Sequence, residues 1–361
     1  MKAEEVRQLV RGRWGEILAA LAPQLRPALD RAGRHVPCPV HGGKDGYRVF
    51  RDVAETGGSV CNTCGAFADG FATLMWANGW DFPTALRMVA ECLRIGGARA
   101  RPVRWTKPVP RKSDTAEEDE KIRQSLNRVW NETIPISDRD AEPARLYLAR
   151  RGISILPPES LRFHPSLAYY DGDKKIGEYP AIIAMVSGAQ GNPVTIHRTY
   201  LTQDGKKAPV DSPKKLMSYP KDRKIIGGAI RLVDPGPVLA IAEGLETALA
   251  VLEGTGLPVW CAVNALLLEN FVPPPGVERV VVFADKDRPT DQHPSGHGQE
   301  AAKRLVQRLW EMGIKASAIV PAGSIPPGQK SLDWLDILNR DGKAGFPTLM
   351  SIDQRTVRRA A

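Results

Sequence analysis

Three carboxylates follow two apolar runs of the sequence. Glu243 comes directly after Val238–Ala242, and Asp285 and Asp287 follow Val280–Ala284. Two such runs are expected to be buried strands of one parallel sheet, so that their carboxyl ends face one crevice. Clustered carboxylates suit Mg²⁺ or Mn²⁺, and such sites serve phosphoryl or nucleotidyl transfer. Loop acids are often only solvated, but a repeat of the pattern at two strand ends favours a site.

Four further candidate ligands form two closely spaced pairs. Cys38 and His41 have two residues between them, as do Cys61 and Cys64. This spacing lets both members of a pair face one tetrahedral centre, which is typical of Zn²⁺. Four ligands leave no position for water, so we expect a structural zinc. The alternative, free thiols in a polar loop, is disfavoured because the chain has only 5 cysteines.

Cations and aromatic rings lie between the two ligand pairs. Arg48 and Arg51 accompany Tyr47 and Phe50 in this stretch. Such a mixture suits contact with single-stranded nucleic acid, because bases stack on rings and phosphates attract cations. A zinc domain that is only a staple and one that also reads template fit these residues equally well.

Composition places the chain among globular proteins with a basic surface. Its 361 residues are 42% hydrophobic and 25% charged, with a formal net charge of +9. Excess positive charge favours a polyanionic partner, with nucleic acid first. No run is long and apolar enough to span a membrane, and no signal-peptide core is visible. Few, unevenly spaced cysteines fit a reducing compartment, so we expect a cytoplasmic protein without a membrane partner.

The organisation along the chain predicts an α+β multidomain protein. The last large segment alternates strand and helix patterns, over 238–242, 244–254, 258–263, 278–284, 297–312 and 315–320, which favours a mainly parallel sheet. Residues 1–30 have a helical pattern that Pro23 interrupts. The predicted divisions are a zinc-binding domain with flanking helices (1–97), a linker (98–116), a first core part (117–235), an α/β part (236–345) and a tail (346–361).

The linker is basic and rich in proline, and it contains Trp105. We interpret it as an extended, solvated spacer. The functional alternative is a track for nucleic acid in which Trp105 stacks on a base.

The motifs resemble those of a known family. The residues around the cysteine pairs, Cys38–Phe50 and Gly58–Gly65, resemble the zinc-binding domain of phage- and plasmid-type DNA primases. Those around the carboxylates resemble a Toprim domain, the metal-binding fold of bacterial-type primases and topoisomerases. The segments that resemble Toprim proteins, some of them from mobile elements, are Ala242–Ala250, Phe283–Asp287, His197–Ala208 and Gly227–Leu232.

The resemblance implies an N-terminal zinc ribbon, an RNA polymerase core and a C-terminal Toprim domain. Glu243 then corresponds to an acid/base or metal-adjacent glutamate, and Asp285 and Asp287 to a magnesium-binding pair. Asp333 would complete that site, with Asp336 a weaker candidate. Two departures are His41 at a position where cysteine is usual and a long loop, 288–297, that is rich in Pro and His.

Several side chains just before the first Toprim strand are candidates for nucleotide or template binding: Arg198, Lys207, Lys214, Lys215 and Arg231. Gly227 and Gly228 beside Arg231 would let backbone approach a phosphate. Taken singly, each cation is better explained as part of a solvated surface, and Arg198 and Arg231, which flank apolar runs, rank above the lysines. Glu246, one turn after Glu243, is interpreted as a favourable first-turn acid of a helix, with metal binding as the alternative.

The expected function is a DNA primase that makes short RNA primers on single-stranded DNA from ribonucleoside triphosphates. The sequence has no G-x-x-x-x-G-K-[ST] phosphate loop, so we expect unwinding to come from a separate helicase. A Toprim nuclease and a non-catalytic module that binds single-stranded DNA are the alternatives. DNA cleavage without nucleotides would favour the former, and metal-independent binding without product the latter.

Overall fold

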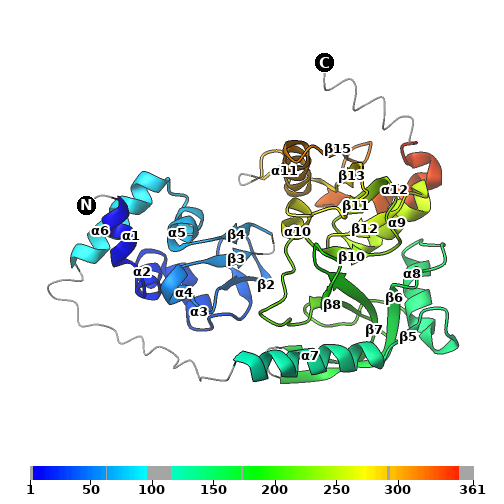
Figure 1. Ribbon diagram of the computed structural model, residues 1–361, viewed down its shortest axis with the longest axis horizontal. Coiled ribbons are helices and arrows are strands. Elements are labelled where there is room, and N and C mark those ends of the chain that lie inside the picture. Colours follow the sequence, from blue (N-terminus) through cyan, green and yellow to red (C-terminus); the bar gives the residue numbers. More distant parts are fainter. Residues whose placement is uncertain (1–2, 62, 96–114, 172–173, 291–292, 349–361) are drawn as a thin grey trace, which may run out of the picture. The chain divides into compact units, whose positions relative to one another are not determined.

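The chain folds into two compact units, Met1–Lys112 and Ser113–Ala361 (Figure 1). The computed structural model describes residues 3–61, 63–95, 115–171, 174–290 and 293–348. No helix in these ranges is both long and apolar enough to cross a membrane. The α+β multidomain architecture expected from the sequence is confirmed; the finer domain boundaries stay a prediction.

The first unit packs short helices around a four-stranded antiparallel sheet, order β1-β2-β3-β4. Its elements are α1 (Ala3–Leu9), α2 (Trp14–Leu21), η1 (Pro23–Leu25), α3 (Arg26–Leu29), β1 (Val36–Cys38), β2 (Gly42–Val49), α4 (Val53–Thr56), β3 (Ser59–Cys61), β4 (Gly65–Phe67), α5 (Gly70–Asn78) and α6 (Phe82–Ile95).

The helix expected over residues 1–30 is broken into four pieces. Besides the break at Pro23, α1 ends before Gly12, whose φ of 73° is a left-handed conformation that glycine adopts freely. The breaks let Trp14, Leu18 and Leu25 all reach the core of the unit, where each is at most 3% exposed.

The second unit contains one ten-stranded mixed sheet, with β15-β13-β11-β12-β10-β7-β6-β5 as its main order and β8 and β9 beside β7. The elements before the parallel strands are α7 (Thr115–Asn131), β5 (Ile134–Pro135), η2 (Arg139–Ala141), α8 (Glu142–Arg150), β6 (Leu161–Asp171), β7 (Lys174–Ser187), β8 (Pro193–Tyr200), β9 (Lys214–Leu216) and β10 (Ala229–Arg231). Residues of α7 pack against the antiparallel strands, with Leu126 and Val129 buried there.

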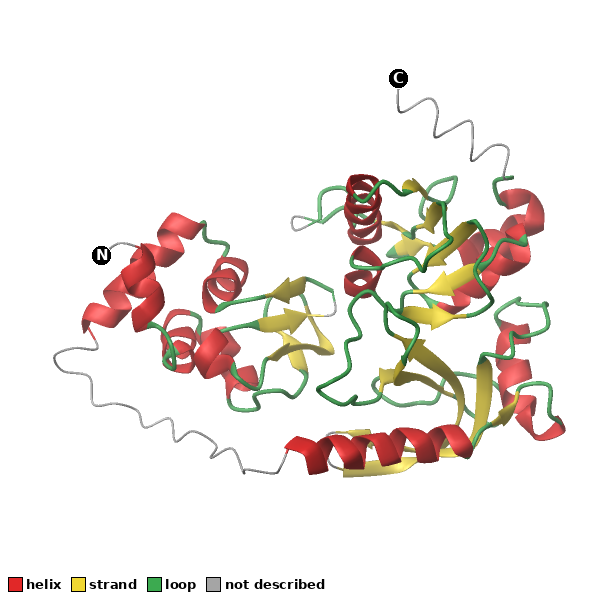
Figure 2. Ribbon diagram, in the orientation of Figure 1, coloured by secondary structure: helices red, strands yellow, loops and turns green. Residues whose placement is uncertain are grey.

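The strands of the last part pair in parallel, β12-β11-β13-β15, as the alternating sequence pattern predicts. The elements are β11 (Val238–Ala242), α9 (Leu245–Thr255), β12 (Val259–Cys261), α10 (Ala265–Glu269), β13 (Arg279–Phe283), β14 (Lys286–Asp287), α11 (His297–Glu311), β15 (Lys315–Ile319), β16 (Ser331–Leu332), α12 (Trp334–Asp341) and η3 (Gly342–Gly345). Helices α9 and α12 cover one face of these strands and α10 and α11 the other (Figures 1 and 2).

Because both faces are covered, the parallel strands are apolar along their length. Each residue of Leu239–Ala242 and Val280–Phe283 has no exposed surface. Burial of each large side chain contributes about 1.5–3 kcal/mol, so the position of the strand ends is held firmly. Glu243 and Asp285 follow these rigid strand ends.

A glycine contact tests the packing of the first unit. A Cβ added to Gly70 would lie 2.1 Å from Cε3 of the buried Trp14. We expect Gly70→Ala to lower the free energy of unfolding by about 1–3 kcal/mol, because the ring has no room to move. Gly15→Ala is the control, since its Cβ meets nothing within 4 Å and α2 gains a better helix former. Equal urea midpoints for both variants would contradict this packing.

Candidate metal centres and nucleotide site

The four cysteine and histidine ligands converge in the first unit. Cys38 ends β1, Cys61 ends β3, and His41 and Cys64 lie in the turns that follow. Cys38 Sγ and Cys64 Sγ are 3.9 Å apart, and His41 Nδ1 is 3.2 Å from Cys64 Sγ and 3.8 Å from Cys61 Sγ. One donor atom of each residue lies within 4.8 Å of every other. A tetrahedral ion with bonds of about 2.0–2.3 Å fits this spacing.

The electrostatics of the metal-free cluster favour deprotonation of Cys61 alone. A hydrogen bond from the Cys64 thiol lowers the pKa of Cys61 to about 5, whereas this hydrogen bond raises the pKa of Cys64 and burial raises the pKa of Cys38. Thiolates close together repel one another unless a cation lies between them. The donor set therefore fits a structural zinc ion, whose charge would stabilise the sulfurs.

Removal of one ligand tests this centre. We expect the wild-type chain to contain about one zinc and Cys61→Ser to lose it, with a lower melting temperature of the first unit, because metal binding is coupled to folding. Cys92→Ser is the matched control, since Cys92 lies in α6 outside the cluster. Elemental analysis and thermal unfolding measure both effects. Unchanged zinc content in Cys61→Ser would contradict the ligand set.

The carboxylates gather at the carboxyl edge of the parallel strands. Ala242 and Phe283 are register partners at the ends of β11 and β13. Glu243 is the first residue after β11 and Asp285 the second after β13, and the charge of Glu243 acts on Asp285. Asp287 lies in β14, which pairs with β16 and so places Asp287 opposite Ser331, two residues before Asp333. The sequence contains no signal for this short pairing, yet it unites the acids of three segments.

Repulsion and burial dominate the electrostatics of this edge. Burial and the charge of Asp287 raise the pKa of Glu243 to about 7, although the Ala265 N–H opposes the shift. Burial raises the pKa of Asp285 well above its ordinary value, and the charges of Glu243 and Asp333 add to the effect. Burial also raises the pKa of Asp333.

The donors that remain free fit a hydrated divalent cation. Asp285 Oδ1 is buried and accepts no hydrogen bond. In the ranges that the structure describes, the cysteine and histidine set is the one group of three or more donors found close enough together to hold a metal ion. Mg²⁺ binds through one or two carboxylates and keeps several waters, so it does not require three converging carboxylates.

Backbone contacts fix the acids in place. Asp287 Oδ2 accepts from Gly298 N–H at 2.7 Å, and a Cβ at Gly298 would lie 3.0 Å from that same oxygen. Asp333 caps α12 by accepting from Asp336 N–H at 2.8 Å, and Asp336 accepts from Asp333 N–H in return. One oxygen of Asp333 is thus used by the helix, and Asp336 serves mainly as its capping partner.

The turn after β12 holds the backbone beside Glu243. Val263 has a φ of 73°, the only positive φ of a non-glycine residue in the described ranges. A β-branched residue strains there by about 1–3 kcal/mol. Cys261 Sγ donates to the Glu243 carbonyl at 3.2 Å, while the strained turn leads to the N–H of Ala265 that faces the Glu243 carboxylate.

The long loop that begins at Arg288 returns to the acidic edge through α11. His293 Nδ1 lies 2.8 Å from Glu300 Oε2, and the His293 and His297 rings pack edge to face at 4.6 Å. Residues 291–292 lie outside the described ranges.

The candidate cations occupy three different surroundings. Arg198 is internal: it donates to Tyr200 Oη at 2.9 Å and to the Leu216 carbonyl at 3.0 Å, and burial lowers its pKa. These contacts leave it little room to meet a nucleotide. Lys215 Nζ lies 4.4 Å from the centre of the Tyr169 ring.

Lys207 and Lys214 lie near the acidic edge. Burial lowers the pKa of Lys207, Lys214 and Arg151 lower it further, and Glu246 and Asp333 oppose them. Cations from two separate loops and one strand therefore surround Asp333 and Glu246. These residues are far apart in the sequence, so the sequence alone does not indicate that they form one group.

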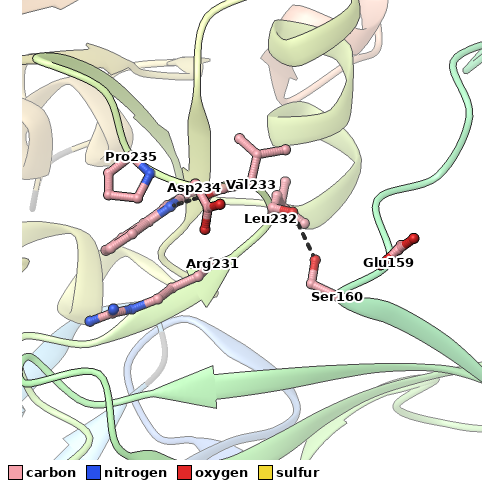
Figure 3. A pocket seen from close by; sticks show the side chains of 8 residues that line it. Glu159, Ser160, Arg231, Leu232, Val233, Asp234 and Pro235 are labelled. Atoms are coloured by element: carbon pink, nitrogen blue, oxygen red, sulfur yellow. Dashed lines mark hydrogen bonds between the residues drawn. The ribbon is translucent and has the colours of Figure 1, made fainter.

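Arg231 belongs to a different feature. Its guanidinium lies 4.4 Å from the centre of the Trp260 ring. Both residues line a cavity of about 480 Å³ that also includes Asp234 and Glu159 (Figure 3). The two acids make the charge of this cavity mixed.

The predicted template contacts of the first unit are partly visible. The Arg48 guanidinium lies 5.8 Å from the centre of the Phe50 ring, and the side chain of Arg51 covers Gly33. Trp105 lies outside the described ranges. None of these positions establishes contact with nucleic acid, so all three stay predictions.

Glu246 lies in the first turn of α9, as expected from the sequence. The sequence did not indicate that it is also buried, with only 5% of its side chain exposed. It accepts hydrogen bonds from Tyr147 and Lys214. The mostly apolar sequence around it in α9 was the available signal, but its partners are remote in the sequence.

Family comparisons agree with this architecture. Residues 33–71 match the zinc-binding domain of primase-helicase, and residues 238–344 match the Toprim domain. Residues 120–227 match a family described as a domain of unknown function. No curated protein sequence gives a significant match.

Solved primases are similar at low identity. The zinc-binding and RNA polymerase domains of the Aquifex aeolicus primase are 13% identical, with a TM-score of 0.40, over 95% of this chain and 85% of that chain. The primase fragment of the bacteriophage T7 primase-helicase protein is 14% identical, with a TM-score of 0.33, over 86% and 96%. A DnaG primase catalytic domain bound to single-stranded DNA is 14% identical, with a TM-score of 0.41, over 66% and 80%.

The domain matches define the class: this is a zinc-ribbon and Toprim protein. Its N-terminal zinc ribbon is of the primase type and its Toprim domain is C-terminal to it, which confirms the resemblance to primases drawn from the motifs.

The raised pKa of Glu243 gives a test of the acidic edge. A carboxyl whose pKa is about 7 in the folded chain and 4.5 ordinarily stabilises the fold when protonated, and this stability is lost as the pH rises from about 4.5 to 7. Without divalent cations we expect the difference in unfolding free energy between wild type and Glu243→Gln to change by about 3 kcal/mol between pH 4.5 and pH 8. Saturating Mg²⁺ should remove most of the wild-type loss at pH 8. Parallel pH curves for both proteins would contradict the raised pKa.

Proposed function

We propose that this chain is a DNA primase that joins ribonucleoside triphosphates into short primers on single-stranded DNA. The observation that carries the proposal is the set of repelling carboxylates at the sheet edge, where the charges of Glu243 and Asp333 act on Asp285 and Asp333 lies near cations. Such a site suits a substrate that brings both divalent cation and phosphates. The primase-type zinc ribbon and the Toprim domain support the same conclusion.

In this proposal Asp285, Asp287 and Asp333 hold Mg²⁺ or Mn²⁺, with Glu243 adjacent. The bound cation supplies orientation of the triphosphate and neutralises charge on its oxygens. Glu243 would accept the proton of the attacking 3′-hydroxyl, directly or through a water molecule, because it lies beside the proposed ligands of the cation. The new bond joins the 3′-oxygen to the α-phosphorus, and the bond to pyrophosphate breaks.

The neighbouring cations would receive the rest of the substrate. We assign Lys207 and Lys214 to the triphosphate because both lie near the Asp333 side of the edge. Lys215 and Arg231 are proposed as template contacts. Arg198 is left out of this set, since both of its Nη atoms donate hydrogen bonds inside the protein.

The zinc domain would guide the template. Arg48 and Arg51 would contact phosphates, and Trp105 would stack on a base. A separate helicase would supply the single strand, and the replicon would be a phage, plasmid or other mobile element. The zinc thiolates require a reducing environment, which the cytoplasm provides.

Primer synthesis tests the proposal directly. Purified chain is incubated with single-stranded DNA, Mg²⁺ or Mn²⁺ and labelled ribonucleotides. We expect short oligoribonucleotides from the wild type and a loss of about 100-fold or more in Asp285→Ala and Asp287→Ala, because the cation contributes several kcal/mol to transition-state stabilisation.

Asp204→Ala is the control, since Asp204 is an exposed acid paired with Lys206 outside the edge. It should retain activity. Cleaved DNA without primers would replace the primase with a nuclease. Full activity in both Asp285→Ala and Asp287→Ala would overturn the assignment of the metal site.

A further inference from the structure

A buried carboxylate lies one turn beyond Glu243 and is bound by two side chains from outside the parallel part of the sheet. Glu246 Oε2 lies 2.5 Å from Lys214 Nζ of β9, and Oε1 accepts from the Tyr147 hydroxyl of α8. Both oxygens thus have donors. Burial raises the pKa of Glu246, but the charge and hydrogen bonds of Lys214 and Tyr147 outweigh it and lower the pKa to about 2.

Lys214 keeps part of its surface open to solvent. Its side chain is 36% exposed, compared with 5% for that of Glu246. An ammonium group has three donors, of which Glu246 takes one. The other N–H groups are therefore available to a ligand. The pair is buried at its acidic end and open at its basic end.

The charges around the pair do not cancel. Four charged side chains act on Lys207: Lys214, Arg151, Glu246 and Asp333. Arg151 Nε is buried and has no hydrogen-bond partner. Three cations against two carboxylates leave excess positive charge beside the acidic edge, where an anionic ligand would be stabilised.

A buried ion pair need not serve function. Replacement of such a pair by apolar side chains of similar volume is often neutral or stabilising, so burial alone gives no reason to keep charges there. A functional reason to keep the Glu246–Lys214 pair would exist if it orients the partly exposed Lys214 ammonium toward phosphates. A free lysine side chain loses about 2 kcal/mol of rotamer entropy when it is fixed, and prior fixation removes part of this loss from binding.

We infer that Tyr147 and Glu246 are positioning residues that hold the Lys214 ammonium where the phosphates of a nucleoside triphosphate bind. The inference rests on the proposed function for the identity of the ligand. Tyr147 fixes one oxygen of Glu246, Glu246 fixes Lys214, and Lys214 contacts the triphosphate. Neither Tyr147 nor Glu246 touches the ligand.

The experiment separates positioning from stability. Binding of ATP in the presence of Mg²⁺ is measured by calorimetry, together with the melting temperature and, for primer synthesis, kcat and KM. The variants are Tyr147→Phe, Glu246→Gln, Lys214→Met and the double substitution Glu246→Met with Lys214→Met. Lys206→Met is the matched control, because Lys206 is a 66% exposed lysine paired with Asp204 in the neighbouring turn.

We expect Lys214→Met to weaken ATP binding about 10-fold, as loss of one charge-assisted hydrogen bond does. Tyr147→Phe and Glu246→Gln should raise KM several-fold and leave kcat within about 2-fold, because only the binding of phosphates depends on them. The double substitution should melt near the wild-type temperature, since no buried charge is left unpaired, and yet bind ATP as weakly as Lys214→Met.

Two results would overturn the inference. One is wild-type ATP affinity in the double variant, which would make the pair a replaceable structural contact. The other is an unchanged KM in Tyr147→Phe and Glu246→Gln below their melting temperatures. A wild-type chain that binds ATP but makes no primer would overturn the polymerase and leave the positioning role standing. A wild-type chain that binds no ATP would overturn both.

Discussion

Repulsion between carboxylates at one edge of the parallel strands is the constraint on which the second unit depends. Glu243 and Asp285 follow the ends of neighbouring strands, and burial raises the pKa of both. The charge of Asp287 adds to the shift of Glu243, and the charge of Glu243 adds to that of Asp285. Such an arrangement persists only if the surrounding structure is rigid. The unexposed residues of β11 and β13 supply this rigidity, and the contact of Asp287 with Gly298 and the capping box at Asp333 hold the remaining acids.

The two candidate metal centres differ in whether they leave coordination positions open. The cysteine and histidine donors already converge within 4.8 Å on a small sheet, so one ion closes the shell and joins β1 to β3. The carboxylates form no such compact group in the described ranges, and one oxygen of Asp333 already accepts a hydrogen bond from α12. A site of the second kind leaves room for water and for ligands that arrive with the metal. Ligand spacing thus separates a centre that stabilises a fold from one that can exchange its occupants.

The sequence was sufficient for features that are local. The continuous apolar runs before Glu243 and Asp285 predicted buried parallel strands, because strands covered on both faces have no polar alternation. The paired ligand spacing likewise predicted the knuckles of the zinc cluster. In both cases the relevant residues are adjacent in the chain, so their spacing carries the geometry.

Features that depend on remote contacts were hidden. Nothing near Glu246 indicates that Tyr147 and Lys214 will reach it, and nothing near Arg198 indicates that Tyr200 and a carbonyl will occupy its donors. The β14–β16 pairing, two residues on each side, is too short to have a pattern of its own. Tertiary contacts therefore decided which charged residues face the site and which are internal.

One short strand, β10, joins the antiparallel and the parallel strands of the second unit into one sheet. β10, only three residues long, pairs antiparallel with β7 on one side and with β12 on the other, and it lies in neither of the two matched family segments that flank it. Cutting the chain on either side of this strand would leave an open sheet edge at β7 or β12, with unpaired N–H and C=O groups that invite aggregation. For the design of chimaeras, the piece that keeps this sheet intact is therefore the whole second unit, whereas the Toprim segment alone would expose the edge of β12.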